Sequence, residues 1–516
     1  MIDGCSTPTP RAARRRARTR PARRGPRPAD RRRDRRLPRR RAGDALRSRA
    51  RPHARRPSLR AQAVVEAPPD DCPGAALVIA ADTRRALPWL AAAFHGYPAR
   101  GLRVIGVTGT DGKTTTCHMI HALLEQAGSR TGLLSTVGAR IGAALYDTGL
   151  HTTTPGSVEV QALLAEMRDG GARYVVLETT SHALAQERTA ACEYDVAVVT
   201  NVTPEHLDYH GTLDAYRATK ARLFAALASH RKPGQPKIAV LNADDPGCAL
   251  FREAARAADV VLTYALDTPA DVRALSIDAA PGGQAATIDL CGEEITLGLP
   301  LPGRHNVANA LAALAVGHAL GAAPATMRAA LEAFSGVPGR WERVEAGQPF
   351  GVVVDFAHTP NALRALLAGL RAETPGRLIA VFGCAGERDA RKRPEMGRIA
   401  AALADLVVLT SEDPRCEDPE AIVAAIAAGC EDAGAVEAVS YWRVMDRAAA
   451  LRFAVDLAAP GDTVVATGKG HEASLCIGTT EHPWDERTVL QQALARQGYA
   501  PGSAPPPHRP TIARRA

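Results

Sequence analysis

The chain has few residues of several kinds, and each shortage limits what the protein can be. Only six of its 516 residues are Lys, and aromatic residues make up 4%. Ten Cys are present, but none are spaced as a CxxC pair. This argues against a zinc site or a disulfide framework and for a reducing compartment. No apolar run reaches the roughly 18 residues of a membrane span. The sequence therefore predicts a cytoplasmic protein without a membrane segment.

Positive charge is concentrated at the N-terminus. Residues 1–60 contain 23 Arg, no Lys and four Asp, a balance of +19, so the rest of the chain carries −10 of the formal net charge of +9. Such an arm could bind nucleic acid or anionic lipid, but it has no aromatic interleaving and no amphipathic period. With almost no large aliphatic residues it cannot offset the entropy of folding. We therefore predict that this arm is disordered. Over a binding function we favour arginine-rich sequence without a fold of its own, for which a mis-annotated or frameshifted start is one explanation.

Two series of apolar runs alternating with helical patterns follow the arm. Strand candidates of the first series are 103–107, 174–178, 195–201 and 237–242. A hairpin signal then precedes a helix expected from Val307 to Leu320, with Asn306 as a possible N-cap. Strand candidates of the second series are 352–357, 378–383, 405–411 and 462–468. The alternation predicts an α/β fold, with a mostly parallel central sheet and a separate C-terminal Rossmann-like α/β domain.

A Gly-rich turn lies between the first strand of the first series and a helix. The segment 104–116, VIGVTGTDGKTTT, contains Gly112-Lys113-Thr114. Glycines let backbone N–H groups surround phosphate oxygens, the lysine neutralises phosphate charge, and the Thr hydroxyl can bind Mg²⁺. Because the earlier glycine is Gly106 and position 107 is Val, the strict GxxxxGK[ST] pattern fails by one residue. We interpret the turn as a phosphate-binding P-loop, with an ordinary strand-to-helix turn as the alternative.

The form TGTxGKTT resembles the P-loop of the Mur ligases and of their relative folylpolyglutamate synthetase. The resemblance implies ATP and Mg²⁺ as cofactors and a central P-loop ATPase domain. It also implies ATP-binding residues, which are Gly109, Thr110, Asp111, Gly112, Lys113, Thr114, Thr115, Asn306, Arg340 and Asp355. Arg340 and Asp355 belong to a C-terminal domain that would close over the nucleotide.

Later segments resemble the family's metal-binding residues. Glu178 follows the P-loop on a strand, and the segment 200–224 is similar to one that supplies a His and a carbamylated Lys, which map to His206 and Lys220. The resemblance implies catalytic roles for Lys113, Glu178, His206 and Lys220. It implies that Thr114, Glu178, His206 and carbamylated Lys220 organise magnesium. Alone, a loop His or a helical Lys is usually a solvated structural residue.

The resemblance also implies a division into domains. The expected boundaries are 1–61 for a disordered Arg-rich segment, 62–101 for the remnant of an N-terminal UDP-binding domain, 102–337 for the central ATP-binding domain, 338–499 for the C-terminal amino-acid-binding domain and 500–516 for a disordered tail. Because the first domain is incomplete, uridine recognition is left open.

Several segments are similar to the family branch that adds the third residue of the peptidoglycan stem peptide. The segments 151–155 and 179–188 imply a binding site for UDP-MurNAc-L-Ala-D-Glu. The residues that would contact it are Thr153, Thr154, Thr180, Gln186 and Arg188. Thr152 stands where the family usually has Asn. Where diaminopimelate-adding enzymes carry DNPR, this chain has Glu412, Asp413, Pro414 and Arg415. An arginine can bind the second carboxylate of diaminopimelate bidentately. Arg388, Gly468 and Glu472 would complete the site, with Glu472 pairing with the distal ammonium.

These expectations describe a monomeric, ATP-dependent ligase that adds meso-diaminopimelate through an acyl phosphate, with no nucleic-acid or membrane partner. Because Glu-Asp replaces Asp-Asn, the pocket gains a negative charge, and L-lysine stays open as the substrate. A folylpolyglutamate- or cyanophycin-type ligase is a second alternative. Such a ligase would share the nucleotide site but not the segments 179–188 and 468–472 (GKGHE), so these segments argue against it. A nucleic-acid-binding NTPase is a third. It would show strongly salt-dependent binding, and the acidic body of the chain argues against it.

Overall fold

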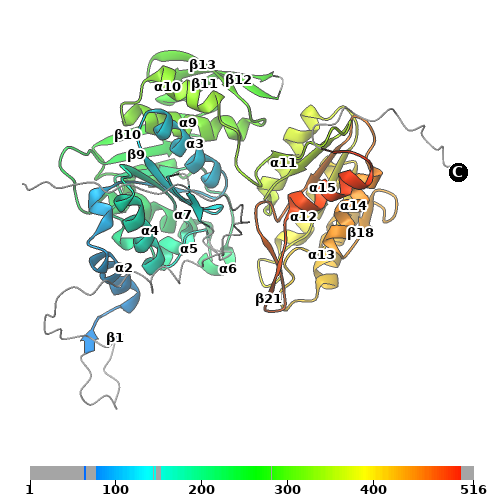
Figure 1. Cartoon of the computed structure of the whole chain (residues 1–516), viewed down its shortest axis with the longest axis horizontal. Coiled ribbons are helices and arrows are strands. Elements are labelled where there is room, and N and C mark those ends of the chain that lie inside the picture. The colour runs from blue at the N-terminus through cyan, green and yellow to red at the C-terminus, as the bar shows by residue number, and fades with distance from the viewer. Residues whose placement is uncertain (1–62, 66–76, 143, 147–152, 281, 501–516) are drawn as a thin grey trace, which may run out of the picture. The chain divides into compact units, whose positions relative to one another are not determined.

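The computed structural model describes residues 63–65, 77–142, 144–146, 153–280 and 282–500, which all belong to one compact unit, Arg55–Ala516 (Figure 1). The predicted Arg-rich segment 1–61, residues 501–516 of the predicted tail, and Thr152 lie outside the described residues. Within the described ranges, no helix is long and apolar enough to cross a membrane.

A short region precedes the central sheet. Strands β1 (Ala63–Val65) and β2 (Leu77–Ile79) pair in parallel, and helix α2 (Thr83–Phe94) follows. The Asp82 carboxylate accepts hydrogen bonds from the Arg84 and Arg85 backbone N–H groups and so caps the start of the helix. A 3₁₀ turn, η1 (Pro98–Gly101), leads into the central sheet.

The central sheet has eleven strands in the order β13-β12-β11-β10-β9-β8-β3-β7-β4-β5-β6. Its parallel strands are β3 (Arg103–Thr108), β4 (Thr131–Ser135), β7 (Tyr174–Glu178), β8 (Val196–Val199), β9 (Ile238–Asn242), β10 (Val260–Ala265) and the start of β11 (Val272–Ala280). Antiparallel strands extend both edges, namely β5 (Gly138–Ile141), β6 (Ala144–Tyr146), β12 (Gly283–Leu290) and β13 (Glu293–Leu299). The mostly parallel sheet confirms the predicted fold class.

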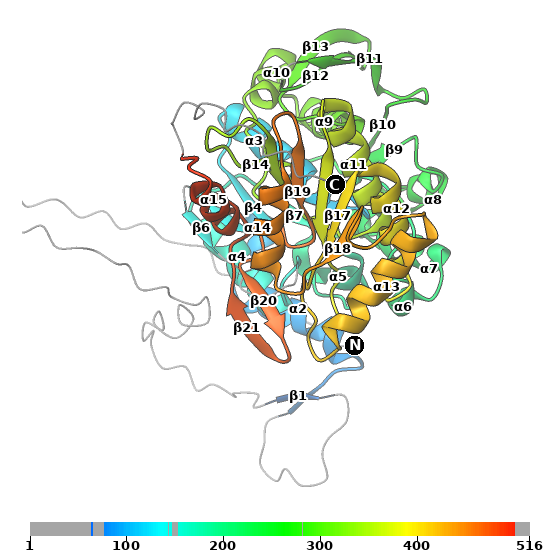
Figure 2. The same cartoon turned by 90° about the vertical axis from the view of Figure 1, so that its right-hand side faces the viewer.

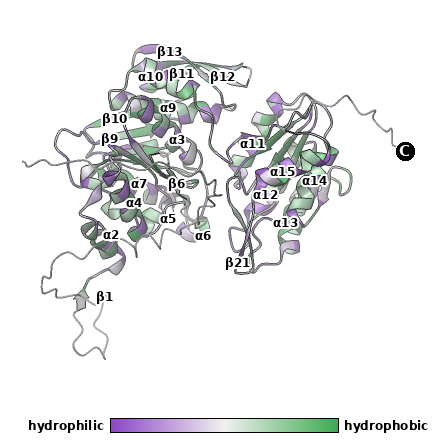
Figure 3. Ribbon diagram, in the orientation of Figure 1, coloured by the Kyte–Doolittle hydropathy of each residue, from purple (hydrophilic) through white to green (hydrophobic). Residues whose placement is uncertain are grey.

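Helices cover both faces of this sheet, which explains why its parallel strands are nearly continuous apolar runs. One buried cluster joins the strands to α3 (Lys113–Gln126), α9 (Arg304–Ala319) and α10 (Pro324–Glu332). The other joins them to α4 (Ser157–Asp169), α7 (Leu213–Ala225) and α8 (Cys248–Ala254). Figure 3 shows the mixture of hydrophobic and hydrophilic colours along the surrounding helices.

The predicted N-cap of α9 is wrong. The helix begins at Arg304, and Gly303, with φ +88°, is its N-cap residue. Asn306 lies in the first turn, where its Nδ2 donates to the Pro302 carbonyl oxygen at 2.7 Å and its Oδ1 accepts from Asn309. The side chain of Asn306 therefore fastens the loop before the helix instead of capping the helix.

The second sheet has six strands in the order β14-β15-β19-β16-β17-β18. These strands are β14 (Glu342–Arg343), β15 (Gly351–Val354), β16 (Leu378–Phe382), β17 (Leu406–Leu409), β18 (Tyr441–Arg443) and β19 (Thr463–Ala466). All neighbours pair in parallel except β14 and β15. The sheet confirms the predicted separate C-terminal α/β domain.

Helices cover this sheet on both faces as well (Figure 2). One face carries α11 (Pro360–Glu373), α12 (Lys392–Leu403) and α13 (Pro419–Asp432). The other carries α14 (Arg447–Leu457) and α15 (Glu486–Arg496). A hairpin of β20 (Ser474–Ile477) and β21 (Thr480–Pro483) follows β19.

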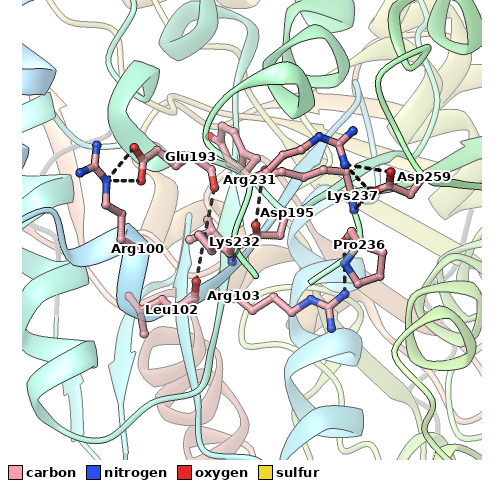
Figure 4. A network of polar contacts seen from close by, with 12 residues as sticks. Arg100, Leu102, Arg103, Glu193, Asp195, Arg231, Lys232, Pro236, Lys237 and Asp259 are labelled. Carbon is pink, nitrogen blue, oxygen red and sulfur yellow. Dashed lines mark hydrogen bonds and ion pairs between the residues drawn. The ribbon is translucent and has the colours of Figure 1, made fainter. Parts of the chain in front are cut away.

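A buried ion network lies where three neighbouring strands of the central sheet begin (Figure 4). Asp195 directly precedes β8, and its carboxylate pairs with Lys232 Nζ at 2.5 Å and Lys237 Nζ at 3.1 Å. Asp195 also accepts the Val104 backbone N–H of β3, and Lys232 donates to the Leu102 carbonyl oxygen. Because both lysines and the aspartate are almost fully buried, this network fastens the amino ends of β3, β8 and β9 together.

Candidate active site

The predicted P-loop connects the carboxyl end of β3 to the start of α3. Gly109 has φ +149°, and a Cβ built there would lie 1.8 Å from Thr200 Oγ1. Gly112 is the N-cap residue of α3 with φ +80°, and its Cβ would lie 2.3 Å from Asn309 Oδ1. Both positions therefore require glycine, because the backbone is in a region that favours it and neighbouring atoms fill the space. Lys113 opens the helix, and its Nζ donates to the Thr110 carbonyl oxygen at 2.6 Å.

Glu178 ends β7 next to the P-loop, because β7 is the neighbour of β3 in the sheet. It is 1% exposed, and its Oε1 accepts the Thr114 hydroxyl at 3.0 Å. Its Oε2 accepts the Thr136 backbone N–H at 2.9 Å. The two carboxylate oxygens are thus held in fixed directions beside the phosphate loop.

The donor set around Thr114 and Glu178 fits Mg²⁺. This ion is usually held by one or two carboxylates together with waters and substrate phosphates. Across the ranges that the structure describes, no group of three or more His, Cys, Asp or Glu side chains could hold a metal by itself. A hydroxyl and a carboxylate 3.0 Å apart agree with a metal whose remaining ligands come from the nucleotide and water.

Lys220 lies behind the P-loop. It is 1% exposed, its Nζ donates to the Gly109 carbonyl oxygen at 2.5 Å, and it sits 4.4 Å from the Tyr216 ring centroid. Burial and the neighbouring Lys113 ammonium lower the pKa of Lys220 well below its usual value. Neither lysine forms an ion pair with a described residue. At this end of the sheet, therefore, burial favours the neutral amine of Lys220, and the Lys113 ammonium has no carboxylate partner among the described residues.

The predicted His206 opens the short helix α6 (Leu207–His210) with φ +54°. Its Nε2 lies 3.7 Å from Glu205 Oε1, and its ring packs against that of His182. Burial raises the pKa of Glu205, but the charges of His206, His358, Lys113 and Lys220 outweigh this and lower it to about 2. Glu205 is therefore a carboxylate near neutral pH, and the sequence reasoning missed it because it offered no motif signal beyond its place before His206.

The predicted dipeptide residues gather near the carboxyl end of β7. Thr180 is the N-cap residue of α5 (Ser181–Ala185), and its hydroxyl accepts the Ala183 backbone N–H at 3.2 Å. Thr154 is fully buried, and its hydroxyl donates to the Glu178 carbonyl oxygen at 2.8 Å. Arg188 donates to the Thr154 carbonyl oxygen. Hydrogen bonds thus join the 153–154 segment to the strand end and to α5.

Arg340 and Asp355 lie together at the start of the second domain. Asp355 accepts the backbone N–H groups of Trp341 and Ala357, each at 2.7 Å. The Arg340 guanidinium lies 4.4 Å from the Phe356 ring centroid, and its Nη2 lies 3.4 Å from Thr114 Oγ1. The Arg340 guanidinium therefore reaches the phosphate loop.

The predicted amino-acid site contains two arginines and a cluster of acidic groups around one buried lysine. Lys469 is fully buried, and its Nζ contacts Asp413 Oδ1 at 2.9 Å and Glu472 Oε2 at 2.6 Å. One ammonium group therefore faces two carboxylates, Asp413 and Glu472, while Glu412 lines the same cavity. Arg388 and Arg415 carry no ion pair with a described carboxylate, and burial and Arg415 lower the pKa of Arg388.

Most of the predicted residues line one cavity of about 870 Å³. The predicted residues that line it are Thr110, Asp111, Gly112, Lys113, Thr114, Thr115, Thr153, Glu178, Thr180, Arg188, His206, Asn306, Arg340, Asp355, Arg388, Glu412, Asp413, Arg415, Gly468 and Glu472. Those that are not among the lining residues are Gly109, Thr154, Gln186, Lys220 and Pro414. Thr136 also lines the cavity, but no motif marked it. The only available signal was its place after β4, a strand parallel to β7.

Comparisons with known proteins agree with this geometry. Residues 107–317 match the Mur ligase middle domain, and residues 339–470 match the Mur ligase glutamate ligase domain. The UDP-N-acetylmuramyl-tripeptide synthetase of Roseiflexus sp. (strain RS-1) is 48% identical over 424 residues, covering 81% of this chain and 83% of the relative. The UDP-N-acetylmuramoyl-L-alanyl-D-glutamate–2,6-diaminopimelate ligase of Geobacillus thermodenitrificans is 42% identical, covering 81% and 84%.

Solved structures show the same relationship. A UDP-N-acetylmuramoyl-L-alanyl-D-glutamate–2,6-diaminopimelate ligase superposes with a TM-score of 0.58 and 32% identity, covering 85% of this chain and 87% of that one. A Mycobacterium tuberculosis folylpolyglutamate synthase complexed with ADP shares the fold, with a TM-score of 0.61, 22% identity and coverage of 82% and 96%. The P-loop, the buried carboxylate beside it and these similarities together show that the chain belongs to the Mur ligases, a family of ATP-dependent enzymes that form amide bonds.

Proposed function

We propose that this chain adds meso-diaminopimelate to UDP-MurNAc-L-Ala-D-Glu, converting ATP to ADP and phosphate. The observation that carries the proposal is that one cavity is lined by the P-loop, by Thr153, Thr180 and Arg188, and by the arginines Arg388 and Arg415. These three sets are where the resemblance puts the nucleotide, the muramyl dipeptide and the amino acid. The names of the relatives describe the same reaction.

In this proposal the nucleotide lies on the P-loop, with its phosphates near Lys113 and the first turn of α3. Thr114 and Glu178 would hold Mg²⁺, which supplies charge neutralisation for the phosphoryl group that is transferred. Lys113 and Arg340 add positive charge at the same place. Catalysis then comes mainly from positioning and electrostatic stabilisation.

The reaction has two bond-forming steps. The terminal carboxylate of the dipeptide attacks the γ-phosphorus of ATP, and ADP leaves, giving an acyl phosphate. The free amine of the incoming amino acid attacks the acyl carbon, and phosphate leaves from the tetrahedral intermediate as the amide forms and the amine loses a proton. Residues of the second domain, such as Arg340 and Asp355, would limit access of water to the acyl phosphate.

Arg388 and Arg415 support diaminopimelate as the amino acid. Two guanidinium groups without carboxylate partners suit a second carboxylate, which L-lysine does not have. Lys469 pairs with both Asp413 and Glu472, so the Glu-Asp pair at 412–413 still brings negative charge to the site. L-Lysine remains the competing substrate in the experiment below.

Lys220 is the residue for which we propose carbamylation. A neutral amine is the form that adds CO₂, and burial keeps the pKa of Lys220 low. The product would be an anion placed among Lys113, Gly109 and the P-loop. With ¹³C-bicarbonate, a carbamate carbonyl signal should appear in the wild-type protein and be absent from Lys220→Met. A spectrum without that signal would contradict the modification.

The first experiment measures phosphate release from ATP by purified protein with UDP-MurNAc-L-Ala-D-Glu and Mg²⁺, comparing meso-diaminopimelate, L-lysine and no amino acid. Release that needs both dipeptide and diaminopimelate is the expected result. A preference for lysine would overturn the role of Arg415. Release with a folate and glutamate in place of these substrates, or release stimulated by nucleic acid, would support the alternatives instead.

A further inference from the structure

Thr136 joins the nucleotide side of the cavity to the dipeptide side. It directly follows β4, and because β4 and β7 are parallel neighbours, it lies at the same sheet edge as Glu178. It lines the cavity and belongs to none of the motifs on which the proposed function rests.

The backbone of Thr136 sets the direction of Glu178. Its N–H donates to Glu178 Oε2 at 2.9 Å, while the Thr114 hydroxyl donates to Glu178 Oε1 at 3.0 Å. Any residue except proline at position 136 could make the backbone hydrogen bond. The choice of a threonine must therefore be explained by its side chain.

The hydroxyl of Thr136 is the middle member of a row of three hydroxyl groups. It donates to Thr153 Oγ1 at 3.1 Å, and it lies 3.4 Å from Thr114 Oγ1. Thr114 stands at the proposed phosphate and magnesium position, and Thr153 at the proposed dipeptide position. The acyl phosphate would form where these two substrates meet, so Thr136 lies between the groups that hold the two reacting partners.

We propose that Thr136 is a positioning residue that couples nucleotide binding to dipeptide binding through its hydroxyl group. This inference rests on the proposed function, because it needs both substrates. A threonine that only shapes the turn between β4 and β5 would tolerate valine, which has the same shape and β-branching but no hydroxyl. A coupling threonine would tolerate serine, which keeps the hydroxyl, better than valine.

The test compares Thr136→Val with Thr136→Ser in the full chain. Dipeptide affinity is measured by calorimetry with and without Mg²⁺ and a non-hydrolysable ATP analogue, and turnover is measured by phosphate release. In the wild type the analogue should change dipeptide affinity by a coupling factor, typically about 5- to 150-fold. Thr136→Val should bring this factor close to one and lower turnover by about tenfold. Thr136→Ser should keep most of both, and ATP-analogue affinity alone should stay unchanged in either variant.

Several outcomes would overturn the inference. One is full coupling and turnover in Thr136→Val, which would mean that the hydroxyl is not needed. Another is an equal loss in both variants together with a lower melting temperature, which would mean that the residue has only a structural role. If the wild-type protein bound no dipeptide, the proposed function would fail first, and that result is distinguishable because it appears without any substitution.

Discussion

Lysines are buried at both ends of the parallel strands of the central sheet, but their surroundings differ. At the amino ends, Lys232 and Lys237 share the carboxylate of Asp195 (Figure 4). At the carboxyl ends, the buried Lys220 donates to the Gly109 carbonyl oxygen, and Lys113 donates to the Thr110 carbonyl oxygen. The first end is internally neutralised, whereas at the second end the Lys113 ammonium has no carboxylate partner among the described residues and can pair with a bound anion.

This contrast separates residues that stabilise the fold from residues that bind ligand. A buried ion pair with its partner present is satisfied, and removing one member is costly. A buried cation without a partner lowers stability and is therefore a candidate for function. The C-terminal domain repeats the contrast, because Lys469 pairs with Asp413 and Glu472 while Arg388 and Arg415 have no carboxylate partner among the described residues.

The largest effect is expected from breaking the neutralised end. Asp195→Asn would leave two buried ammonium groups without a carboxylate, so the free energy of unfolding should fall by about 3–5 kcal/mol. Chemical denaturation measures this change. As a control, Asp267→Asn removes the exposed partner of Arg304 and should change stability little. Equal stability of the two variants would contradict a stabilising role for the Asp195 network.

The opposite result is expected at the other end. Lys220→Met should lower turnover by about 10²–10³-fold, because the proposed carbamate, an anion beside the P-loop, can no longer form. The melting temperature should be unchanged or higher, because an unpaired buried amine is replaced by an apolar side chain of similar length. Phosphate release and thermal unfolding on one preparation test both parts. A destabilised protein with full activity per folded molecule would reverse our assignment of the two ends.

A smaller and more selective effect is expected in the C-terminal domain. Arg415→Met should raise the KM for diaminopimelate by about 10- to 100-fold, as expected for the loss of a charged hydrogen bond worth about 1.5–3 kcal/mol. The KM values for ATP and the dipeptide should stay the same. Arg398→Met, which removes an exposed pair with Asp432, is the matched control. An unchanged KM for diaminopimelate would show that Arg415 does not contact it.

The smallest effect concerns Asp111 in the P-loop. Burial and the neighbouring Glu205 carboxylate raise the pKa of Asp111 to about 6. Approaching phosphates favour the protonated form further, so ATP affinity without Mg²⁺ should weaken as pH rises above about 6, by at most tenfold per pH unit. Calorimetry in two buffers should detect proton uptake in the wild type and none in Asp111→Asn. The same uptake in both proteins would assign it to another group.

Local patterns predicted much of the architecture. The apolar runs at 103–107, 174–178, 237–242 and 378–383 coincide with strands of the two sheets to within one residue, because strands covered on both faces are mostly apolar along their length. The P-loop was recognisable because its backbone shape restricts Gly109 and Gly112 to glycine. Helix ends were less predictable. Asn306 looks like a cap in sequence, yet Gly303 occupies that position and Asn306 bonds to Pro302.

The sequence by itself determined the α/β alternation, the P-loop and the order of the candidate site residues, since each depends on residues close together in the chain. Tertiary structure alone decided which charged groups form ion pairs and which polar groups form hydrogen bonds at the site. Asp195 meets Lys232 and Lys237, Asp413 meets Lys469, and Thr136 meets Thr114 and Glu178, across separations of 22 to 56 residues. Such pairs form because parallel strands bring distant segments to one sheet edge, and the spacing of residues along a chain carries no direct record of that distance.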